Sequence, residues 1–511
     1  MALSDNRRQR IFTFCALYFA QGIPWGFMLL TLPSYLLDTY GEFFGDDEIG
    51  RLKAIILIPW SFKLIWAPIM DSFTIRSMGR RRPWIIGAEL LMAFTLLGLI
   101  GLGDLSNQLR ALLLMYFVHN CFASLQDVCT DAMAVDLLPA NEQGQLNGLM
   151  WGSKLVGKAG GAWVLSYVIN WGGIEACVAV QVTLLLLIIL VPLYVLERPG
   201  ERRFPWSTGA AQGNENRGLE ELKMVVLDQI KRFSLPRDQR SDITLLAKIC
   251  WPAISLLLTI AKTIKAFGVL TLVVYVAFTL TKLIGTGVNE VVANTLFIKQ
   301  LGWSDIEFTT ASGPITILPV ILGTFLGGTL ADRYGRRLII CLGYGGFAVA
   351  TIAFASLPEY WNNTVQLAVP ASLQSIVGSS ELDVKWFGLS YIVAYETLTA
   401  IGAVGFLSMA MRISWSKSAA TVFTVYMTLS NVSHVVGNWL AGPIRTASTD
   451  YVNSAGIESS AAVIYSYQLT FWFCGLTTLP VLLLLLWVRT ESVDKAEQHR
   501  LAVEAGEEIE A

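Results

Sequence analysis

The chain has 511 residues, of which 54% are hydrophobic and only 15% are charged. Soluble globular proteins carry closer to a quarter charged residues, so this composition excludes an ordinary soluble domain. The net charge of −2 gives no basis for a nucleic-acid partner, and the 7 cysteines form no CxxC pair, so we expect no disulfide framework, no metal site and no cofactor.

Long apolar runs dominate the first part of the chain. Each is long enough, at about 20 residues, to cross a bilayer as a helix, and a spanning segment must satisfy its own backbone hydrogen bonds. The first run is too long for a signal-peptide core, so we interpret it as a retained first helix. The pattern predicts six spans, at residues 11–37, 49–70, 83–102, 110–138, 146–170 and 174–196.

A polar stretch, residues 197–265, is predicted to be a cytoplasmic linker. Within it, Leu219, Leu222, Val226, Ile230 and Phe233 have helical apolar spacing, which indicates a helix lying on the membrane surface or one packed on the bundles. Residues 245–264 are apolar enough to span. A thirteenth span would put the termini on opposite sides, so we favour an interfacial helix.

The second set of spans is predicted at residues 266–297, 308–331, 338–355, 387–411, 419–440 and 463–488. The chain is therefore predicted to be an all-α integral membrane protein with two six-helix bundles. Residues 1–196 form the first bundle, 197–265 the linker, 266–490 the second bundle and 491–511 an acidic cytoplasmic tail.

A basic, glycine-containing hairpin occurs twice, at equivalent places in the two halves. Duplicated helical membrane proteins are usually transporters. We favour a hinge latch over a role in orientation alone, and Asp136, at the end of span four, could pair with the arginines near Arg80. The residues concerned are Asp71, Arg80 and Arg81 in the first copy and Gly328, Asp332, Arg333, Gly335 and Arg336 in the second.

Positive charge predicts the orientation of the spans. Arginines precede span one and follow spans two, eight and ten, whereas the opposite side is poor in cations. The positive-inside rule then places both termini in the cytoplasm.

Ionisable groups inside spans are costly, so their distribution is informative. Spans six, nine and twelve have none in their cores, and span three has only Glu89. The others together contain Lys63, Asp127, Asp131, Lys154, Lys158, Lys282, Glu290, Glu396 and His434. This pattern predicts a central polar cavity lined by most of the helices.

Spans four and five are predicted to be antiparallel neighbours. At a rise of about 1.5 Å per residue, Asp131 matches Lys154 in depth and Asp127 matches Lys158. The two members on each helix are four residues apart and share a face. Two cross-helix ion pairs are therefore geometrically possible, and they would serve either packing or the handling of substrate and protons.

Glycines recur along span five. Residues 152–159 nearly spell a phosphate-binding loop, but Ala159 replaces the required Ser or Thr and the segment lies within a span. Glycines 148, 152, 157 and 161 are instead predicted to permit close helix approach. Without a nucleotide site, we expect a gradient-driven mechanism.

Residues 328–337, GTLADRYGRR, match the loop motif of major facilitator superfamily transporters. The segments KLIWAPIMD (63–71), GRRRPW (79–84) and QDVCTDAMAVDLLP (126–139) resemble the muropeptide permease (AmpG) branch, which is related to the eukaryotic acetyl-CoA transporters. The segments KLIG (282–285) and YETL (395–398) are also similar to its pattern.

This resemblance implies two six-helix bundles that rock around a central cavity. It also implies proton-driven import of cell-wall sugar–peptide fragments into the bacterial cytoplasm. The matching positions are Lys63, Asp127, Asp131, Lys282 and Glu396.

The chemistry of such a substrate predicts its contacts, because sugar rings stack on aromatic side chains and carboxylates bind cations. The candidates are Gln21, Trp25, Lys63, Trp151, Lys154 and Lys282. Each Trp could instead anchor at the interface, each Lys could pair with a buried carboxylate, and Gln21 could cap the kink at Pro24. Proton coupling is assigned to Asp127, Asp131 and Glu396, with Lys158 kept as a structural residue.

We therefore predict a multi-pass inner-membrane transporter that is monomeric and whose partners are a small-molecule substrate, the lipid bilayer and a proton. Another organic anion, such as an acyl-CoA or a folate-like compound, is an alternative substrate. A membrane receptor or scaffold without flux is an alternative of a different class. An enzyme is not expected, because no nucleophile–base or metal constellation is visible in the sequence.

Overall fold

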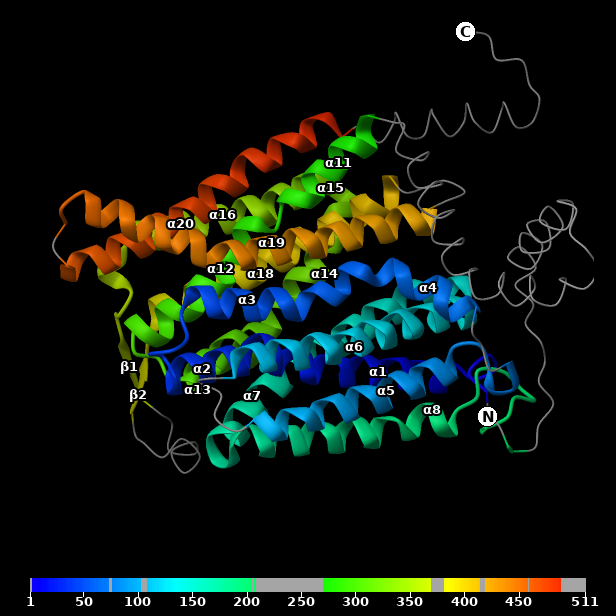
Figure 1. Ribbon diagram of the computed structural model, residues 1–511. Helices are drawn as coiled ribbons and strands as arrows, with labels where there is room; N and C mark the ends of the chain where they lie inside the picture. Colours follow the sequence, from blue (N-terminus) through cyan, green and yellow to red (C-terminus); the bar gives the residue numbers. More distant parts are fainter. Residues whose placement is uncertain are drawn as a thin grey trace, which may run out of the picture.

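The computed structural model describes residues 2–72, 76–102, 108–204, 206–207, 270–368, 381–413, 419–457 and 459–488. Its helices run side by side along one direction, and the two halves of the chain form two groups that lie against each other (Figure 1). The start of α1 and the short helix α8 lie at one end of the bundle, and the strands β1 and β2 lie at the other (Figure 1).

The first half contains the six predicted spans. Spans one and two are α1 (Arg7–Gly26), η1 (Phe27–Thr31) and α2 (Leu32–Thr39), then α3 (Asp46–Leu57), η2 (Ile58–Phe62) and α4 (Lys63–Ser72). After η3 (Arg76–Met78), span three is α5 (Arg82–Leu97) with η4 (Gly98–Leu102), and span four is α6 (Leu109–Leu137). Spans five and six are the two arms of α7 (Ala140–Ile188), followed by α8 (Leu190–Tyr194). The arms meet at Gly172 and Gly173, where the backbone leaves the helical conformation.

The second half repeats this arrangement. Span seven is α11 (Leu270–Thr281), α12 (Ile284–Thr295) and η7 (Leu296–Gln300), and span eight is α13 (Asp305–Thr310), η8 (Ala311–Ile315) and α14 (Thr316–Tyr334). Span nine is α15 (Arg336–Ile340), η9 (Cys341–Gly345) and α16 (Gly346–Ser356). Spans ten to twelve are α18 (Trp386–Ile413), α19 (Ala419–Ser454) and α20 (Ser459–Leu483) with η11 (Leu484–Trp487).

One element departs from the all-α prediction. The loop after span nine contains η10 (Pro358–Tyr360) and an antiparallel pair, β1 (Val365–Ala368) and β2 (Glu381–Val384), with Val365 opposite Val384. Four-residue strands outside an apolar run give too little periodicity to be recognised in a sequence.

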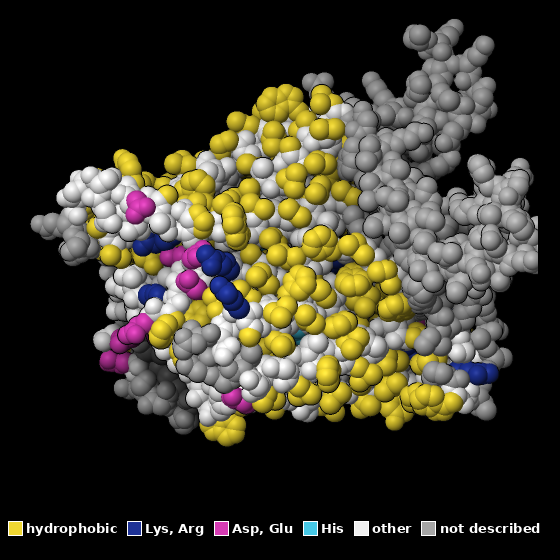
Figure 2. Space-filling view, viewed as in Figure 1, with side chains coloured by type: hydrophobic (Ala, Val, Ile, Leu, Met, Phe, Trp, Pro, Cys, Tyr) yellow, Lys and Arg dark blue, Asp and Glu magenta, His cyan; other side chains and the backbone are white. Residues whose placement is uncertain are grey.

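The surface has the character of a membrane protein. Nine helical segments of the described residues are long and apolar enough to cross a bilayer, and one of them contains both arms of α7. On the face shown in Figure 2, apolar side chains cover the middle of the molecule, and charged side chains gather toward its two ends. An apolar belt of this kind is what a bilayer requires.

Breaks inside the spans position several predicted site residues. Pro24 precedes the π-helical η1, Pro59 lies at the start of η2, and Pro314 lies inside the π-helical η8. Proline has no N–H to donate and disrupts the regular ladder. Lys63 begins α4 directly after η2, and Lys282 lies in the break between α11 and α12. In secondary transporters, interrupted helices near the middle of the membrane commonly form ligand sites.

Glycine permits close helix crossings in both halves of the chain. A Cβ added at Gly157 would lie 3.2 Å from Gly22 Cα, and one added at Gly287 would lie 3.0 Å from the Gly437 carbonyl carbon. Span five therefore packs against span one, and span eleven against span seven, through backbone contact. Of the four glycines predicted to allow this in span five, Gly157 and Gly161 do so, whereas positions 148 and 152 have nothing within 4 Å.

The two halves are tied together at the end that carries β1 and β2. Asn170 Nδ2 donates to Asp305 Oδ2 at 2.7 Å, and an Arg445 nitrogen lies 3.6 Å from Asp46 Oδ2. These bonds join spans five and six to span eight and span two to span eleven. Closer to the middle, Asn431 Nδ2 donates to the Trp60 carbonyl oxygen at 3.1 Å.

Candidate functional site

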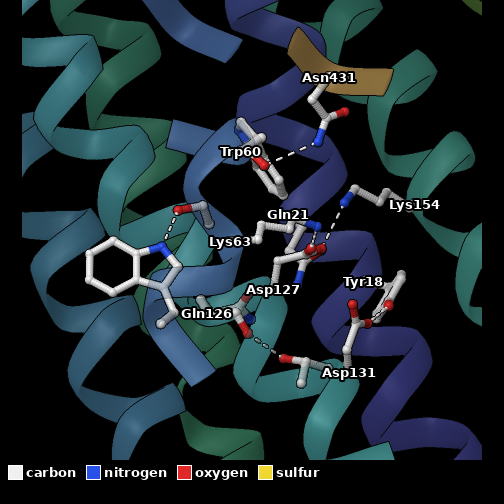
Figure 3. Close-up of polar contacts among 12 residues, drawn as sticks. Tyr18, Gln21, Trp60, Lys63, Gln126, Asp127, Asp131, Lys154 and Asn431 are labelled. Carbon is white, nitrogen blue, oxygen red and sulfur yellow. Dashed lines mark hydrogen bonds and ion pairs between the residues drawn. The ribbon is translucent and has the colours of Figure 1, made fainter. Parts of the chain in front are cut away.

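Asp127 is the centre of a polar group in the first half, where α6 presents it to two lysines. Lys154 Nζ, from α7, lies 2.9 Å from Asp127 Oδ1, and Lys63 Nζ contacts Asp127 Oδ2 (Figure 3). The side chains of Asp127 and Lys154 are 4% exposed, and that of Lys63 is 20% exposed. One carboxylate thus faces two ammonium groups, and Lys63 is the member that water reaches most.

The predicted partners of these charges are wrong, although the residues do gather. Asp131 accepts a hydrogen bond from the Tyr18 hydroxyl instead of pairing with Lys154, and Asp127 pairs with Lys154 instead of Lys158. Equal depth was the basis of the prediction, but α1 packs along α7 and also contacts α6. Side chains of α1 therefore lie between spans four and five, and Tyr18 meets Asp131 from there (Figure 3).

Four aromatic rings surround the Lys154 ammonium group. Its Nζ lies 4.8 Å from the ring centroid of Trp60, 4.9 Å from that of Trp25, and 5.6 Å from those of Tyr18 and Trp151. Trp25 and Trp60 are stacked, with centroids 6.3 Å apart. Because ring faces attract a cation within about 6 Å, this aromatic cage stabilises the ammonium group in a site with little water.

Trp60 and Tyr18 are absent from the predicted site. A signal exists for Trp60, since it lies three residues before Lys63 beside Pro59, and that spacing puts it on the same helix face as the lysine. The indole N–H groups of Trp25 and Trp60 are buried and have no hydrogen-bond partner among the described residues. Two donors next to Lys154 are therefore available to a ligand or to water.

Gln21 lies at the cage but is engaged with the protein. Its Nε2 donates to Gln126 Oε1 (Figure 3). Gln126 Nε2 donates in turn to Glu89 Oε1 at 3.2 Å. Gln21 is 6% exposed, and its Oε1 has no partner among the described residues. The side chain does not cap the kink at Pro24, and its role as a substrate ligand stays a prediction.

Lys282 is separate from the other predicted lysines. Its Nζ donates to Ser430 Oγ at 2.9 Å and to the Tyr344 hydroxyl at 3.2 Å, and it lies 4.0 Å from the Phe406 ring centroid. The side chain is buried inside the second half. The structure therefore does not bring Lys282 together with Lys63 and Lys154.

A second pair of titratable side chains lies in the second half. His434 Nε2, from α19, is 2.9 Å from Glu290 Oε2, on α12, and these side chains are 21% and 29% exposed. Lys158 interacts electrostatically with Glu290 and with Glu396, which lies on α18. Lys158 also lies 6.0 Å from the Trp25 ring centroid. The predicted structural lysine thus lies between the charged groups of the two halves.

The repeated hairpins have the geometry that their glycines suggested. Gly79 has φ 105° and Gly335 has φ 96°, a backbone region that side chains with a Cβ rarely adopt. Arg81 Nε donates to Asp136 Oδ2 at 3.1 Å, and Arg80 lies 3.8 Å from the same oxygen, so the pairing expected for Asp136 is present. The role of this pair as a latch stays a prediction.

In the second copy, an arginine of the hairpin contacts α18. Arg336 Nε donates to the Ser408 hydroxyl at 2.8 Å. Arg333 lies over the Tyr334 ring at 5.3 Å, and Gly328 faces Val404 of α18. The side chains of Asp71 and Asp332 lie outside the described residues.

A glutamate that the sequence did not single out organises the first hairpin. The Glu197 carboxylate accepts hydrogen bonds from the backbone N–H groups of Arg80, Arg81 and Arg82 at 3.1, 2.7 and 2.5 Å. It therefore caps the start of α5, where a helix favours negative charge. The buried Arg82 guanidinium then donates to four backbone carbonyl groups around it, those of Pro192, Met78, Arg202 and Arg203.

Several predictions fall on residues that the structure does not describe. These are the amphipathic segment at residues 219–233, the apolar segment at 245–264 and the acidic tail at 491–511. They stay predictions.

Comparison with known proteins shows which family and which relatives this chain is similar to. The sequence model of the Major Facilitator Superfamily matches residues 12–438. The anhydromuropeptide permease of Escherichia coli K12 is 24% identical over 434 residues, which are 83% of this chain and 72% of that protein. An uncharacterized protein of Schizosaccharomyces pombe is 33% identical over 95 residues, but these span only 19% of this chain and 17% of that protein.

Two solved transporter structures have a similar fold. A D-xylose–proton symporter gives a TM-score of 0.57 at 14% identity, covering 94% of this chain and 99% of the symporter. A nucleoside transporter gives a TM-score of 0.52 at 13% identity, covering 93% of this chain and 98% of the transporter. At such identities the likeness is one of fold.

Proposed function

The chain belongs to the Major Facilitator Superfamily, and we propose that it is a proton-coupled secondary transporter that imports muropeptide-like organic anions. The likeness to the anhydromuropeptide permease supports this substrate class, because it extends over 83% of the chain. The protein would act in the inner membrane as a monomer, with both termini in the cytoplasm.

The observation that carries the proposal is the caged lysine group. Lys63 and Lys154 share a single carboxylate, Asp127, and the Lys154 ammonium group lies among four aromatic rings. A substrate with carboxylates and sugar rings needs cations and flat apolar surfaces side by side. Trp151 is 43% exposed, so one wall of the cage remains open to a ligand.

The same group offers a route to coupling. An incoming carboxylate can take over the lysines from Asp127, and it would do so first at Lys63, the more exposed of the two. Asp127 would then lose its counter-ions in a site with little water, which favours uptake of a proton. Asp131 and Glu396 are the other proposed proton carriers, and Glu396 interacts electrostatically with Lys158 and Lys53 of the first half.

Alternating access would follow from the arrangement of the two halves. A hydrogen bond and an ion pair tie them together at the end that carries β1 and β2, and interrupted spans meet near the middle. We propose that the halves rock about the central group, which releases this end when the opposite end closes. The paired hairpins at Gly79 and Gly335 would act as hinges or latches for that motion.

Uptake into proteoliposomes tests the proposal. Labelled anhydromuropeptides and CoA esters are offered with and without an imposed pH gradient, and counterflow is measured in parallel. We expect counterflow and gradient-driven accumulation of the anhydromuropeptide, with accumulation lost and binding retained in Glu396→Gln. Preference for the CoA ester would favour the alternative anion class, and binding without counterflow would favour a receptor.

A further inference from the structure

The crossing of span one with span five and the crossing of span seven with span eleven have the same geometry. A Cβ added at Gly22 would meet the carbonyl oxygen of Lys154, the carbonyl carbon of Gly157 and the amide nitrogen of Lys158. A Cβ added at Gly287 would meet the same three atoms of His434, Gly437 and Asn438. The crossing therefore defines equivalent positions in the two halves without any alignment of sequences.

This correspondence matches Lys154 and Trp25 of the first half with His434 and Glu290 of the second half. Lys154 lies three residues before Gly157, as His434 lies three before Gly437, and Trp25 lies three after Gly22, as Glu290 lies three after Gly287. In each half the two side chains meet. Lys154 lies 4.9 Å from the Trp25 ring, and His434 lies 2.9 Å from Glu290 Oε2.

The repeat differs in one chemical respect. The first half has an ammonium group, whose ordinary pKa lies well above the physiological range, held by an aromatic ring. The second half has an imidazole, the side chain whose ordinary charge change falls between about pH 5 and 8, held by a carboxylate. Both members of the second pair keep some exposure, 21% for His434 and 29% for Glu290, so water can deliver a proton.

We infer that His434 carries a proton during transport and that Glu290 is its counter-ion, in the position that Lys154 and Trp25 occupy in the first half. This inference rests on the proposed function and adds an imidazole to its acidic candidates. When His434 gives up its proton, Glu290 loses its partner in its own half.

The groups around Glu290 link the loss of the His434 proton to a movement of one half relative to the other. From the first half, Lys53 on α3 donates to the Glu290 carbonyl oxygen at 3.0 Å, and Lys53 and Lys158 both attract its carboxylate. Glu290 thus has partners in both halves, and the charge on His434 decides which side holds it.

The other elements around the pair supply the remaining charges. Glu396 and Tyr395 lie on α18, Lys282 lies at the end of α11 and donates to Ser430, one turn from His434, and Lys63 on α4 is bound to Asp127. Within their described bounds, α11, α20 and η2 contain no Asp, Glu, Lys, Arg or His. The fixed charges near the pair are therefore Lys53, Lys158, Lys282 and Glu396.

The test separates this inference from the proposed function. His434→Lys keeps a positive charge beside Glu290 but cannot release it in the working pH range. With labelled anhydromuropeptide in proteoliposomes, we expect counterflow within about threefold of the unsubstituted protein and accumulation driven by a pH gradient at least about tenfold lower. His119→Gln is the matched control, because His119 is a buried histidine bound to the Met92 carbonyl away from the charged groups; it should retain both activities.

The outcomes have distinct meanings. Full gradient-driven accumulation by His434→Lys overturns the inference and leaves the proposed function standing. Counterflow without any gradient effect in the unsubstituted protein overturns the proposed coupling and this inference together. Failure of the unsubstituted protein to exchange the anhydromuropeptide contradicts the proposed substrate alone.

If the unsubstituted protein does not exchange the anhydromuropeptide, a measurement that needs no substrate tests the inference. In protein with labelled histidine in nanodiscs, the His434 imidazole NMR signals should respond to pH, and Glu290→Gln should alter that response. An imidazole whose protonation state does not change with pH overturns the inference.

Discussion

Lys154 Nζ lies 2.9 Å from Asp127 Oδ1, and Asp127 is at the same time the partner of Lys63. Substituting one of the two lysines should therefore have a different effect from substituting the carboxylate that they share. Removing Lys154 leaves one direct ion pair, whereas removing the charge of Asp127 takes away the carboxylate that both cations contact and leaves Asp131 as the carboxylate near them.

Lys154→Met and Asp127→Asn should consequently differ in stability. We expect Asp127→Asn to cost about 3–5 kcal/mol, the usual penalty for an uncompensated buried charge, and Lys154→Met to cost clearly less. Lys154→Met should nevertheless lower uptake at least about tenfold, because it removes a cation from the proposed anion site. Thermal unfolding in detergent and proteoliposome uptake measure the two effects. Normal uptake by Lys154→Met would reduce this lysine to a packing role.

The glycines of span five allow a matched comparison. Gly157→Ala should destabilise the protein, because its Cβ would press on the Phe19 carbonyl oxygen and on Gly22. Gly152→Ala, five residues away on the same helix, has nothing within 4 Å and should be neutral or stabilising by up to about 1 kcal/mol, since alanine favours a helix more than glycine does. The midpoint of thermal unfolding should fall for the first variant and not for the second. A similar fall for both would show that the crossing does not depend on the missing Cβ.

Much of the fold could be predicted from the sequence, because the membrane makes apolar length and buried charge informative. Helices lie at the twelve predicted runs, and the second of these runs breaks at Pro59. The β1–β2 pair could not be predicted, since its strands are too short to give a period.

The sequence predicted the gathering of the buried charges better than it predicted their contacts. Lys63, Asp127 and Lys154 come together as buried charges of opposite sign should. Their partners depend on which helices are neighbours, and sequence order suggests span five beside span four where α1 in fact intervenes. Trp60 was missed for a related reason, because a tryptophan in an apolar span has no feature that separates packing from binding.

Glu201 should give the first hairpin a dependence on pH. Burial, and then repulsion from Glu197, raises the pKa of Glu201 to about 7. A carboxyl group with a raised pKa in the folded state binds more protons than the unfolded chain between about pH 4.5 and 7, so it lowers stability as pH rises through that window. Its ionised form is the costly one.

Glu201→Gln should therefore raise the thermal midpoint at pH 8 and have little effect at pH 4.5. Glutamine keeps an oxygen that can accept the Glu197 N–H, which Glu201 Oε2 accepts at 2.9 Å. The midpoint of each protein is measured in detergent from pH 4.5 to 8, with Glu142→Gln, which removes a carboxylate from an ion pair with Arg10 in the same half, as a comparison. A variant that loses stability equally at all pH values would contradict the assignment of the charge.

The bonds between the halves at the end that carries β1 and β2 should hold the observed conformation. Asn170→Ala with Asp46→Asn removes the contacts to Asp305 and Arg445, both of which cross between halves. At about 1 kcal/mol for each bond, the population open at this end should rise by roughly tenfold or more.

A buried reporter at the interface can measure that shift. Ser34 is fully buried, and its hydroxyl lies 3.5 Å from Asn294 Oδ1 of the other half. In a background without the native cysteines, Ser34→Cys should react with an impermeant maleimide several-fold faster when the two bonds are absent, by the same population argument. Lys385→Gln is the control, because it breaks a 2.8 Å bond to Glu307 at this end within a single half. If it accelerates the reaction as much as the double variant does, local loosening explains the result and the bonds between the halves do not set the conformation.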